Sequence, residues 1–231
     1  MAMARLTRTE SQARTRADLL ATARDMFLSD GYAKTSLDRV AEEAGYSKGA
    51  VYSNFKTKSA LCLEVLTLIH ETKFEEVSEL VTSGDTLEAR LDRLQGWAER
   101  TLGDVGWTML EFEFAIVARD DPALRAELVS GWSLVRGTIA TQLQALADSM
   151  DLELPLSAED AATAVLSLGV GLGIQRALDP SLSARLVTDT VRALLSGGFN
   201  GGVGFNGGID FNGGVDFNKN AASIRRDSAA G

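Results

Sequence analysis

The sequence predicts an all-α fold of about nine helices, on the basis of three observations. Apolar residues recur at helical spacing through most of residues 15–196. Residues that favour helix starts stand in front of these stretches, and the 231-residue chain has only three prolines to interrupt them. No stretch shows the convincing polar–apolar alternation of a half-buried strand.

The first helix is expected over residues 15–29. Thr15 with Asp18 fits a capping box, and Gly31 follows as a stop. The apolar face of this helix would consist of Leu19, Leu20, Ala23, Met26 and Phe27. The basic residues that precede or open the helix are Arg5, Arg8, Arg14 and Arg16. Two interpretations stay open for them: a solvated, disordered tail, or an arm that touches phosphates or the minor groove.

Two short helices joined by a tight turn are expected next. A hydroxyl of Thr35 or Ser36 would cap the first of them. Gly45 would end it, because a left-handed backbone costs glycine little. The buried face of this helix would comprise Leu37, Val40, Ala41 and Ala44.

The second short helix, residues 48–55, has the character of a recognition helix. Ser47 is its expected cap, and Val51 and Phe55 would point inward. The residues left outward are hydrogen-bonding, cationic or very small: Ser47, Lys48, Gly49, Tyr52, Ser53 and Asn54. A helix with such a face can enter the major groove closely and meet phosphates and base edges. The pair is therefore predicted to be a helix-turn-helix motif that binds DNA.

Six further helices are expected from cap signals and apolar spacing. Their starts are predicted near Lys58, at Asp85 with Glu88, near Trp107, at Asp121-Pro122, at Ser157 with Asp160, and at Asp179-Pro180. The eighth contains Gly169, Gly171 and Gly173, each costing roughly 1 kcal/mol relative to alanine. Either close internal packing or a subunit interface accounts for them. We favour an interface shared with the ninth helix, whose apolar residues are Leu186, Val187, Val191, Leu194 and Leu195.

The composition changes at Gly197. The motif FNGG recurs with a six-residue period, and ten of the 22 glycines lie in residues 197–231. Disorder is expected for this low-complexity segment, in preference to a short β-helix or a calcium-binding repeat. The predicted domains are 12–72 for DNA binding, 73–197 for ligand binding and dimerisation, and 198–231 as a tail.

Charge and composition narrow the function classes. The net charge is −9 overall, but residues 1–60 carry +3 and the remainder −12; phosphate binding requires only a local cationic surface. One cysteine, Cys62, excludes an internal disulfide, and one histidine, His70, argues against multi-histidine zinc sites and Ser-His-Asp catalysis. No run of eighteen apolar residues and no secretory signal is found, so we expect a cytoplasmic protein and no membrane partner.

Several motifs recur together at a distinctive spacing. They are Phe27 with Gly31-Tyr32, Thr35-Ser36, Val40-Ala41, Ala44-Gly45, Ser47-Lys48-Gly49, Tyr52-Ser53-Asn54-Phe55, and Lys58 with Leu61. With them, residues 12–72 closely resemble the DNA-binding domain of the TetR/AcrR family of transcriptional regulators. The resemblance implies a helical ligand-binding domain after the DNA-binding domain, and a homodimer formed through the last two helices.

The resemblance also implies roles for matching positions. Tyr52 and Lys58 would contact phosphates. The residues nearest to the bases, or small enough to allow close approach, would be Lys48, Gly49, Ala50, Ser53 and Asn54. The family more often has histidine where Ser53 stands, so the contact there differs. The DNA-binding set is completed by Thr35, Ser36 and Ser47.

The C-terminal region concentrates large apolar side chains without a catalytic constellation. Such residues form either plain core or the lining of a pocket, and the resemblance favours the pocket. Its expected lining is Leu66, His70, Phe74, Trp97, Trp107, Phe112, Phe114 and Trp132. Glu111 and Glu113 would belong to a solvated face or would select a cationic ligand. Cys62 is expected to be a buried, unreactive thiol.

These observations predict a ligand-responsive repressor that leaves a palindromic operator when a small apolar effector binds. No catalytic residue, metal or cofactor is expected. The expected partners are double-stranded DNA, a second copy of the chain and an effector not named by the sequence. Two alternatives stay open: an all-α enzyme with an appended DNA-binding domain, and an architectural DNA-binding protein without an effector.

Overall fold

The computed structural model describes residues 7–82 and 86–196, and regular structure within these ranges is entirely helical. The helices of the described ranges are α1 (Arg8–Lys34), α2 (Leu37–Glu43), α3 (Lys48–Asn54), α4 (Lys58–Thr82), α5 (Leu87–Thr101), α6 (Val105–Ala118), α7 (Pro122–Ser149), α8 (Ala158–Leu178) and α9 (Arg185–Leu195). The predicted all-α fold is confirmed for this part of the chain. The FNGG repeats and Arg5 lie outside the described residues.

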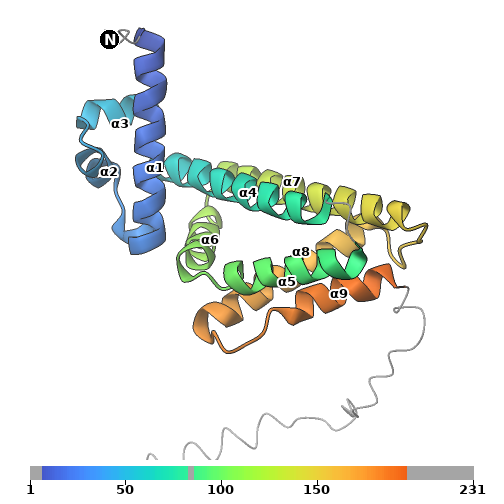
Figure 1. Ribbon diagram of the computed structural model, residues 1–231. Helices are drawn as coiled ribbons and strands as arrows, with labels where there is room; N and C mark the ends of the chain where they lie inside the picture. The colour runs from blue at the N-terminus through green and yellow to red at the C-terminus, as the bar shows by residue number, and fades with distance from the viewer. Residues whose placement is uncertain (1–6, 83–85, 197–231) are drawn as a thin grey trace, which may run out of the picture.

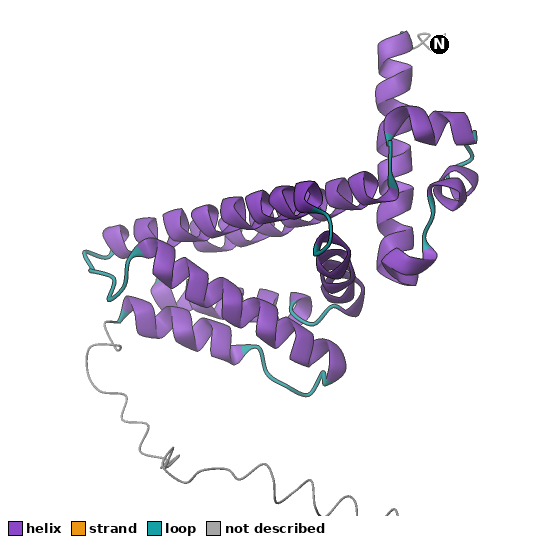
Figure 2. Ribbon diagram, turned by 180° about the vertical axis from the view of Figure 1, so that it is seen from behind, coloured by secondary structure: helices purple, strands orange, loops and turns teal. Residues whose placement is uncertain are grey.

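The helices form an N-terminal unit and a larger C-terminal unit (Figure 1). Helix α1 stands across one end of the molecule, and α2 and α3 pack against it. Helix α4 leaves this unit and runs beside α7, while α5, α8 and α9 lie on the other side of the C-terminal unit (Figure 2). Helix α6 packs against α1 and also contacts α4, α7 and α8. It therefore touches both units.

Helix α1 begins earlier than expected, at Arg8. Thr7 Oγ1 accepts a hydrogen bond from Glu10 N at 3.2 Å, and the Glu10 carboxylate accepts one from Thr7 N at 2.7 Å. This reciprocal pair is a capping box. The box expected at Thr15 is wrong, because that hydroxyl lies inside the helix and donates to the Ser11 carbonyl at 3.0 Å.

Gly31 interrupts α1 rather than ending it. Its backbone has φ 82° and ψ 171°, and a last helical turn continues to Lys34. A positive φ is strained for residues with a Cβ, which explains the glycine at this bend.

Two later helix starts also differ from the prediction. The side chain of Thr86 caps α5, whereas Asp85, the expected cap, lies outside the described residues. Asp179 was expected to open the last helix, but it is the C-cap residue of α8 and accepts hydrogen bonds from Ser181. The Asp-Pro pair therefore forms a turn, and α9 begins only at Arg185 without a side-chain cap. Helix α7 does begin at Pro122 after an Asp121 cap, as predicted.

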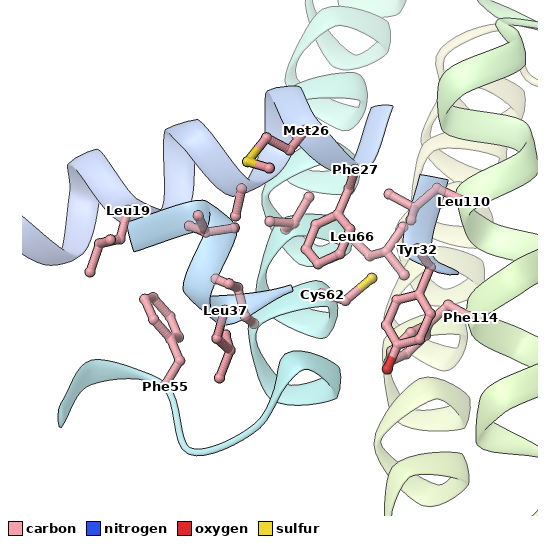
Figure 3. Packing of buried hydrophobic residues seen from close by; sticks show 14 of the residues in the cluster. Leu19, Met26, Phe27, Tyr32, Leu37, Phe55, Cys62, Leu66, Leu110 and Phe114 are labelled. Carbon is pink, nitrogen blue, oxygen red and sulfur yellow. The ribbon is translucent and has the colours of Figure 1, made fainter. Parts of the chain in front are cut away.

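The main core joins the N-terminal unit to α4 and α6. Its members include Leu19, Phe27, Tyr32, Leu37, Phe55, Cys62, Leu66, Leu110 and Phe114 (Figure 3). A second core cluster lies among α5, α7, α8 and α9. Helix α7 contributes to both clusters, with Leu124 in the first and Leu143 in the second, so the N-terminal and C-terminal units are joined by packed side chains as well as by the chain itself.

Helix α8 is long and apolar enough, by length and composition alone, to cross a membrane. Only 28% of its most apolar window is buried within the chain.

Arg176 of α8 is 8% exposed and donates to the carbonyls of Leu102 at 2.8 Å and Glu99 at 2.9 Å. An ion pair with the Glu99 carboxylate at 2.8 Å completes its contacts there. Arg176 thereby fixes the end of α5 against α8.

Candidate DNA-binding surface and effector cavity

Local capping places the short helices α2 and α3. Ser36 Oγ accepts from Arg39 N at 3.2 Å, and Ser47 Oγ accepts from Ala50 N at 3.2 Å. Gly45, with φ 72°, supplies the tight turn between the helices. The cap at Ser47, the predicted stop at Gly45 and the cap at Ser36 are therefore all confirmed.

The outer face of α3 is open to solvent. Ser47, Lys48, Gly49 and Ser53 are exposed, and Tyr52 is 52% exposed despite its aromatic ring. Ser53 Oγ and Asn54 Nδ2 both donate to the Ala50 carbonyl, at 2.9 Å and 2.8 Å. These two side chains are therefore folded back on the helix and would have to turn to reach a base edge.

Lys48 is held by an acidic residue that the sequence analysis did not single out. Its Nζ lies 2.6 Å from the carboxylate of Asp38 on α2. The pair raises the pKa of Lys48 and lowers the pKa of Asp38, in each case chiefly through this hydrogen bond. Both groups are charged at neutral pH, and the Asp38 carboxylate partly cancels the positive charge of Lys48 on this surface.

Two of the expected DNA contacts are placed differently from the rest. Thr35 is 1% exposed, and its hydroxyl donates to the Gly31 carbonyl at 2.9 Å, so it supports the bend in α1 instead of facing outward. Lys58 is half-buried, and its Nζ donates to the Tyr32 carbonyl at 2.9 Å. The same Nζ lies 4.1 Å from the centre of the Tyr32 ring. Neighbouring Lys56 is exposed and was missed, although its charge beside α3 was readable in the sequence.

The arginines expected in an N-terminal arm lie on helix α1 where the structure describes them. Arg16 forms an ion pair with Glu64 of α4 at 2.6 Å. Its guanidinium carbon also lies 4.4 Å from the centre of the Phe55 ring, at the end of α3. Arg16 thus fixes α3 and α4 against α1. Neither expected role, a disordered tail or an arm on the DNA, describes this arginine.

Glu113 connects α6 to the bend in α1. Its carboxylate accepts from the backbone N–H of Tyr32 at 2.6 Å and of Ala33 at 3.2 Å. The hypothesis that Glu113 selects a cationic ligand is therefore wrong, because the side chain faces the DNA-binding unit.

A cavity of about 600 Å³ lies among helices α4 to α9. It is lined by six of the eight residues expected to form a pocket: His70, Phe74, Trp97, Trp107, Phe112 and Trp132. Leu66 and Phe114 do not line it. They lie in the main core with 2% and 0% exposure, because the faces of α4 and α6 that carry them point to α1.

Polar side chains are few in this cavity, and most have partners. His70 Nε2 lies 2.5 Å from the Glu111 carboxylate, which is the sole acidic lining residue in the described ranges. Lys73 pairs with Glu76 at 3.5 Å. Arg90 also lines the cavity, although the sequence analysis did not predict it. The sequence does not show which face of α5 points into the cavity.

Cys62 lies in the main core and is fully buried. Burial raises the pKa of its thiol far above the ordinary value, so the thiol stays protonated at neutral pH. Among the described residues no group of three or more His, Cys, Asp or Glu is placed to hold a metal ion.

Residues 19–65 match the family described as bacterial regulatory proteins, tetR family. Residues 19–65 therefore form a DNA-binding domain of the tetR family. It is 40% identical over 70 residues to the HTH-type transcriptional regulator TtgR of Pseudomonas putida, a match that covers 30% of this chain and 33% of TtgR. It is 42% identical over 66 residues to AcrR of Shigella flexneri, covering 29% of this chain and 30% of AcrR.

The matches to the first curated relatives cover only 23% to 33% of those proteins. The fold likeness extends further along the chain. A transcriptional regulator from Rhodococcus sp. RHA1 superposes with a TM-score of 0.67, covering 79% of this chain and 95% of that one at 17% identity. At this identity the likeness concerns the fold alone, and it extends to the C-terminal helices.

Proposed function

We propose that this chain is a ligand-responsive transcriptional regulator of the TetR/AcrR family, acting in the cytoplasm as a repressor. The observation that carries the proposal is the exposed face of α3, where Lys48, Gly49 and Tyr52 project from a helix too short to be stable alone. The fold holds that helix rigidly through the Ser47 cap and the Arg16–Phe55 contact. A supported, polar, exposed helix is what insertion into the major groove requires.

Contacts to the DNA would divide by chemistry. Tyr52 and Lys56 are exposed beside the recognition helix and would meet phosphates, with Ser36 at the start of α2. Lys58 would add a phosphate contact only if one of its remaining N–H groups points outward, since Nζ also serves the Tyr32 carbonyl. Lys48 and Gly49 would lie nearest the bases.

Binding as a homodimer would present two such helices to a palindromic operator. Helix α8 supports this, because a Cβ at Gly169 or Gly171 would meet no atom of this chain within 4 Å. Internal packing therefore does not require glycine there, and close approach of a second copy would explain it. The apolar residues of α9 expected at that interface, Val187, Val191, Leu194 and Leu195, are instead buried inside the chain. Leu186, 54% exposed, is the member left to contribute.

The cavity would hold the effector, and α6 would transmit its binding. Glu111 lines the cavity and is hydrogen-bonded to His70 of α4. Glu113, two residues further along α6, accepts a hydrogen bond from the backbone at the bend of α1. A ligand wedged between α4 and α6 would shift both helices and change the separation of the two recognition helices. A coupling of about 1–3 kcal/mol would lower operator affinity by roughly 5–150-fold.

Selection of binding sites from random DNA duplexes tests the proposal. A palindrome with half-sites spaced by about one helical turn, ~34–36 Å, or a multiple of it is the expected result. Tyr52→Ala and Lys56→Ala should weaken binding to all sequences, whereas Lys48→Ala should change the selected sequence. An asymmetric motif, or none, would argue for the architectural alternative.

A further inference from the structure

The cavity is lined by an arginine, Arg90, that has no ion-pair partner among the residues the structure describes. Arg90 of α5 lines the cavity and makes no hydrogen bond or ion pair with any residue in the described ranges. Its Nε is buried and has no partner. The other two lining cations are engaged: Lys73 pairs with Glu76, and Arg136 donates to Ser133 at 2.9 Å.

The balance of charge and hydrogen bonding favours one kind of occupant. Three cations and a single carboxylate line the described walls, and that carboxylate, Glu111, is already bonded to His70. Two residues that line the cavity, Arg90 and Trp107, each have a buried side-chain nitrogen without a partner, and both nitrogens, Arg90 Nε and Trp107 Nε1, are donors. A desolvated donor or cation without a partner is costly, and an anionic acceptor removes that cost. Cationic ligands would add repulsion instead.

The shape of the cavity places an apolar region next to Arg90. Leu94 and Trp97 follow it at one-turn intervals on the same face of α5, and both line the cavity. Trp97 Nε1 donates to Glu76 and Arg93 donates to the Leu80 carbonyl, so α5 runs antiparallel to α4 with Arg90 near the C-terminal end of α4. From His70 to Leu80 the chain rises about 15 Å. Arg90 and the His70–Glu111 pair are therefore about 15 Å apart along α4, with the apolar lining residues Phe74 and Val77 between them.

We propose that the effector is an elongated apolar molecule with a carboxylate head, and that Arg90 binds the head. This proposal rests on the proposed function, in that the cavity is taken as the effector site. The guanidinium would donate two parallel hydrogen bonds to the carboxylate, a pairing that suits a planar fork of donors. The apolar body would lie along Phe74, Leu94 and Trp97 toward the His70 end.

Calorimetric titration of the full chain, without DNA, tests the head group directly. The three ligands are decanoate, decanol and decylamine, which share a tail and carry a negative, neutral and positive head at neutral pH. Decanoate should bind roughly tenfold or more tightly than the other two, as a charge-assisted bond predicts. Equal or tighter binding of decanol or decylamine, or binding of none of the three, would overturn the proposal.

Substitution of the arginine assigns the effect to its position. Arg90→Met should bring decanoate affinity to within about twofold of decanol, while decanol affinity changes little; Arg90→Lys should keep part of the preference. Arg185→Met removes an arginine from outside the cavity and should leave all three affinities unchanged. Retention of the decanoate preference in Arg90→Met, or no preference in Arg90→Lys, would contradict the assignment.

A stability measurement separates a binding role from a structural one. Because Arg90 has no partner in the described ranges, Arg90→Met should leave the melting temperature of the ligand-free protein unchanged or raise it. A large fall would mean that Arg90 serves the fold. Since DNA is absent from these titrations, failure of the carboxylate proposal leaves the DNA selection result standing, and the reverse also holds.

Discussion

The carboxylate of Glu113 lies 2.6 Å from the backbone nitrogen of Tyr32 and so fastens α6 to the bend of α1. The Tyr32 ring stacks on Phe27 at a centroid distance of 5.9 Å and meets the edge of Phe114 at 6.0 Å. Its hydroxyl lies 2.9 Å from Ser59 Oγ on α4. Tyr32 is therefore the point where α1, α4 and α6 meet, between the cavity of the C-terminal unit and helix α3.

Glu113→Ala should weaken both folding and coupling. Two backbone donors at the bend would lose their acceptor, which costs about 1–3 kcal/mol when such groups are partly buried. Thermal unfolding should show a lower melting temperature, and an effector should release operator DNA less completely. Glu127→Ala on the exposed side of α7 is the matched control and should change neither. An unchanged effector response in Glu113→Ala would show that α6 does not transmit the signal through this contact.

Asp38→Asn should tighten DNA binding. The substitution removes the negative charge that pairs with Lys48 on the outer face of the helix-turn-helix. Affinity for specific and non-specific duplexes should rise, and the dependence of log affinity on log salt should steepen by up to about one unit. Titrations at several salt concentrations measure both. Asp25→Asn makes the same charge change where Asp25 pairs with Arg24, and should have a smaller effect. If both substitutions raised DNA affinity equally, the change in net charge alone would explain the result, and the Lys48–Asp38 pair would have no special role.

Gly106→Ala should destabilise the protein. A Cβ at Gly106 would lie 2.5 Å from the Leu28 carbonyl oxygen, so α6 would have to move away from α1. Overpacking of this kind costs about 1–3 kcal/mol. Gly137→Ala on α7 is the control, because a Cβ there meets nothing within 4 Å and alanine favours the helix by up to about 1 kcal/mol. Chemical denaturation should place the two variants on opposite sides of the wild type; a shift in the same direction would contradict the packing argument.

Cys62 should resist alkylation while the protein is folded. Burial raises the pKa of its thiol, so the reactive thiolate is suppressed at pH 7.5–9.5 in the native state. The unfolded chain titrates near the ordinary value of about 8.5. The folded pKa is higher than the unfolded pKa. The neutral thiol therefore contributes its full stability below the unfolded pKa, and this contribution is lost as the pH rises from the unfolded pKa toward the folded one. Iodoacetamide labelling followed by mass spectrometry, with and without denaturant, should show rapid reaction only in denaturant. Fast labelling of the native protein would mean that this core opens readily.

Much of the N-terminal unit could be predicted because its signals are local. Ser36, Gly45 and Ser47 act on backbone groups within a few residues, and their roles followed from the turn and cap rules. The start of α1 was predicted wrongly because the sequence offers two possible capping boxes. The one formed by Thr7 and Glu10, further upstream, caps the helix. Asp179 failed as a helix start because an Asp-Pro pair also suits a turn.

The helical class and the helix-turn-helix could be predicted from the sequence, because periodicity and capping depend on near neighbours, and the aromatic content of the C-terminal unit could be read directly. Which face each helix turns to its partners was set by packing between helices. This packing placed Phe114 in the core and Phe112 at the cavity, paired Lys48 with Asp38, and turned Glu113 to α1. Within residues 7–82 and 86–196, it also left Arg90 at the cavity without a partner. These outcomes depend on contacts between residues far apart in the chain, which no local pattern specifies.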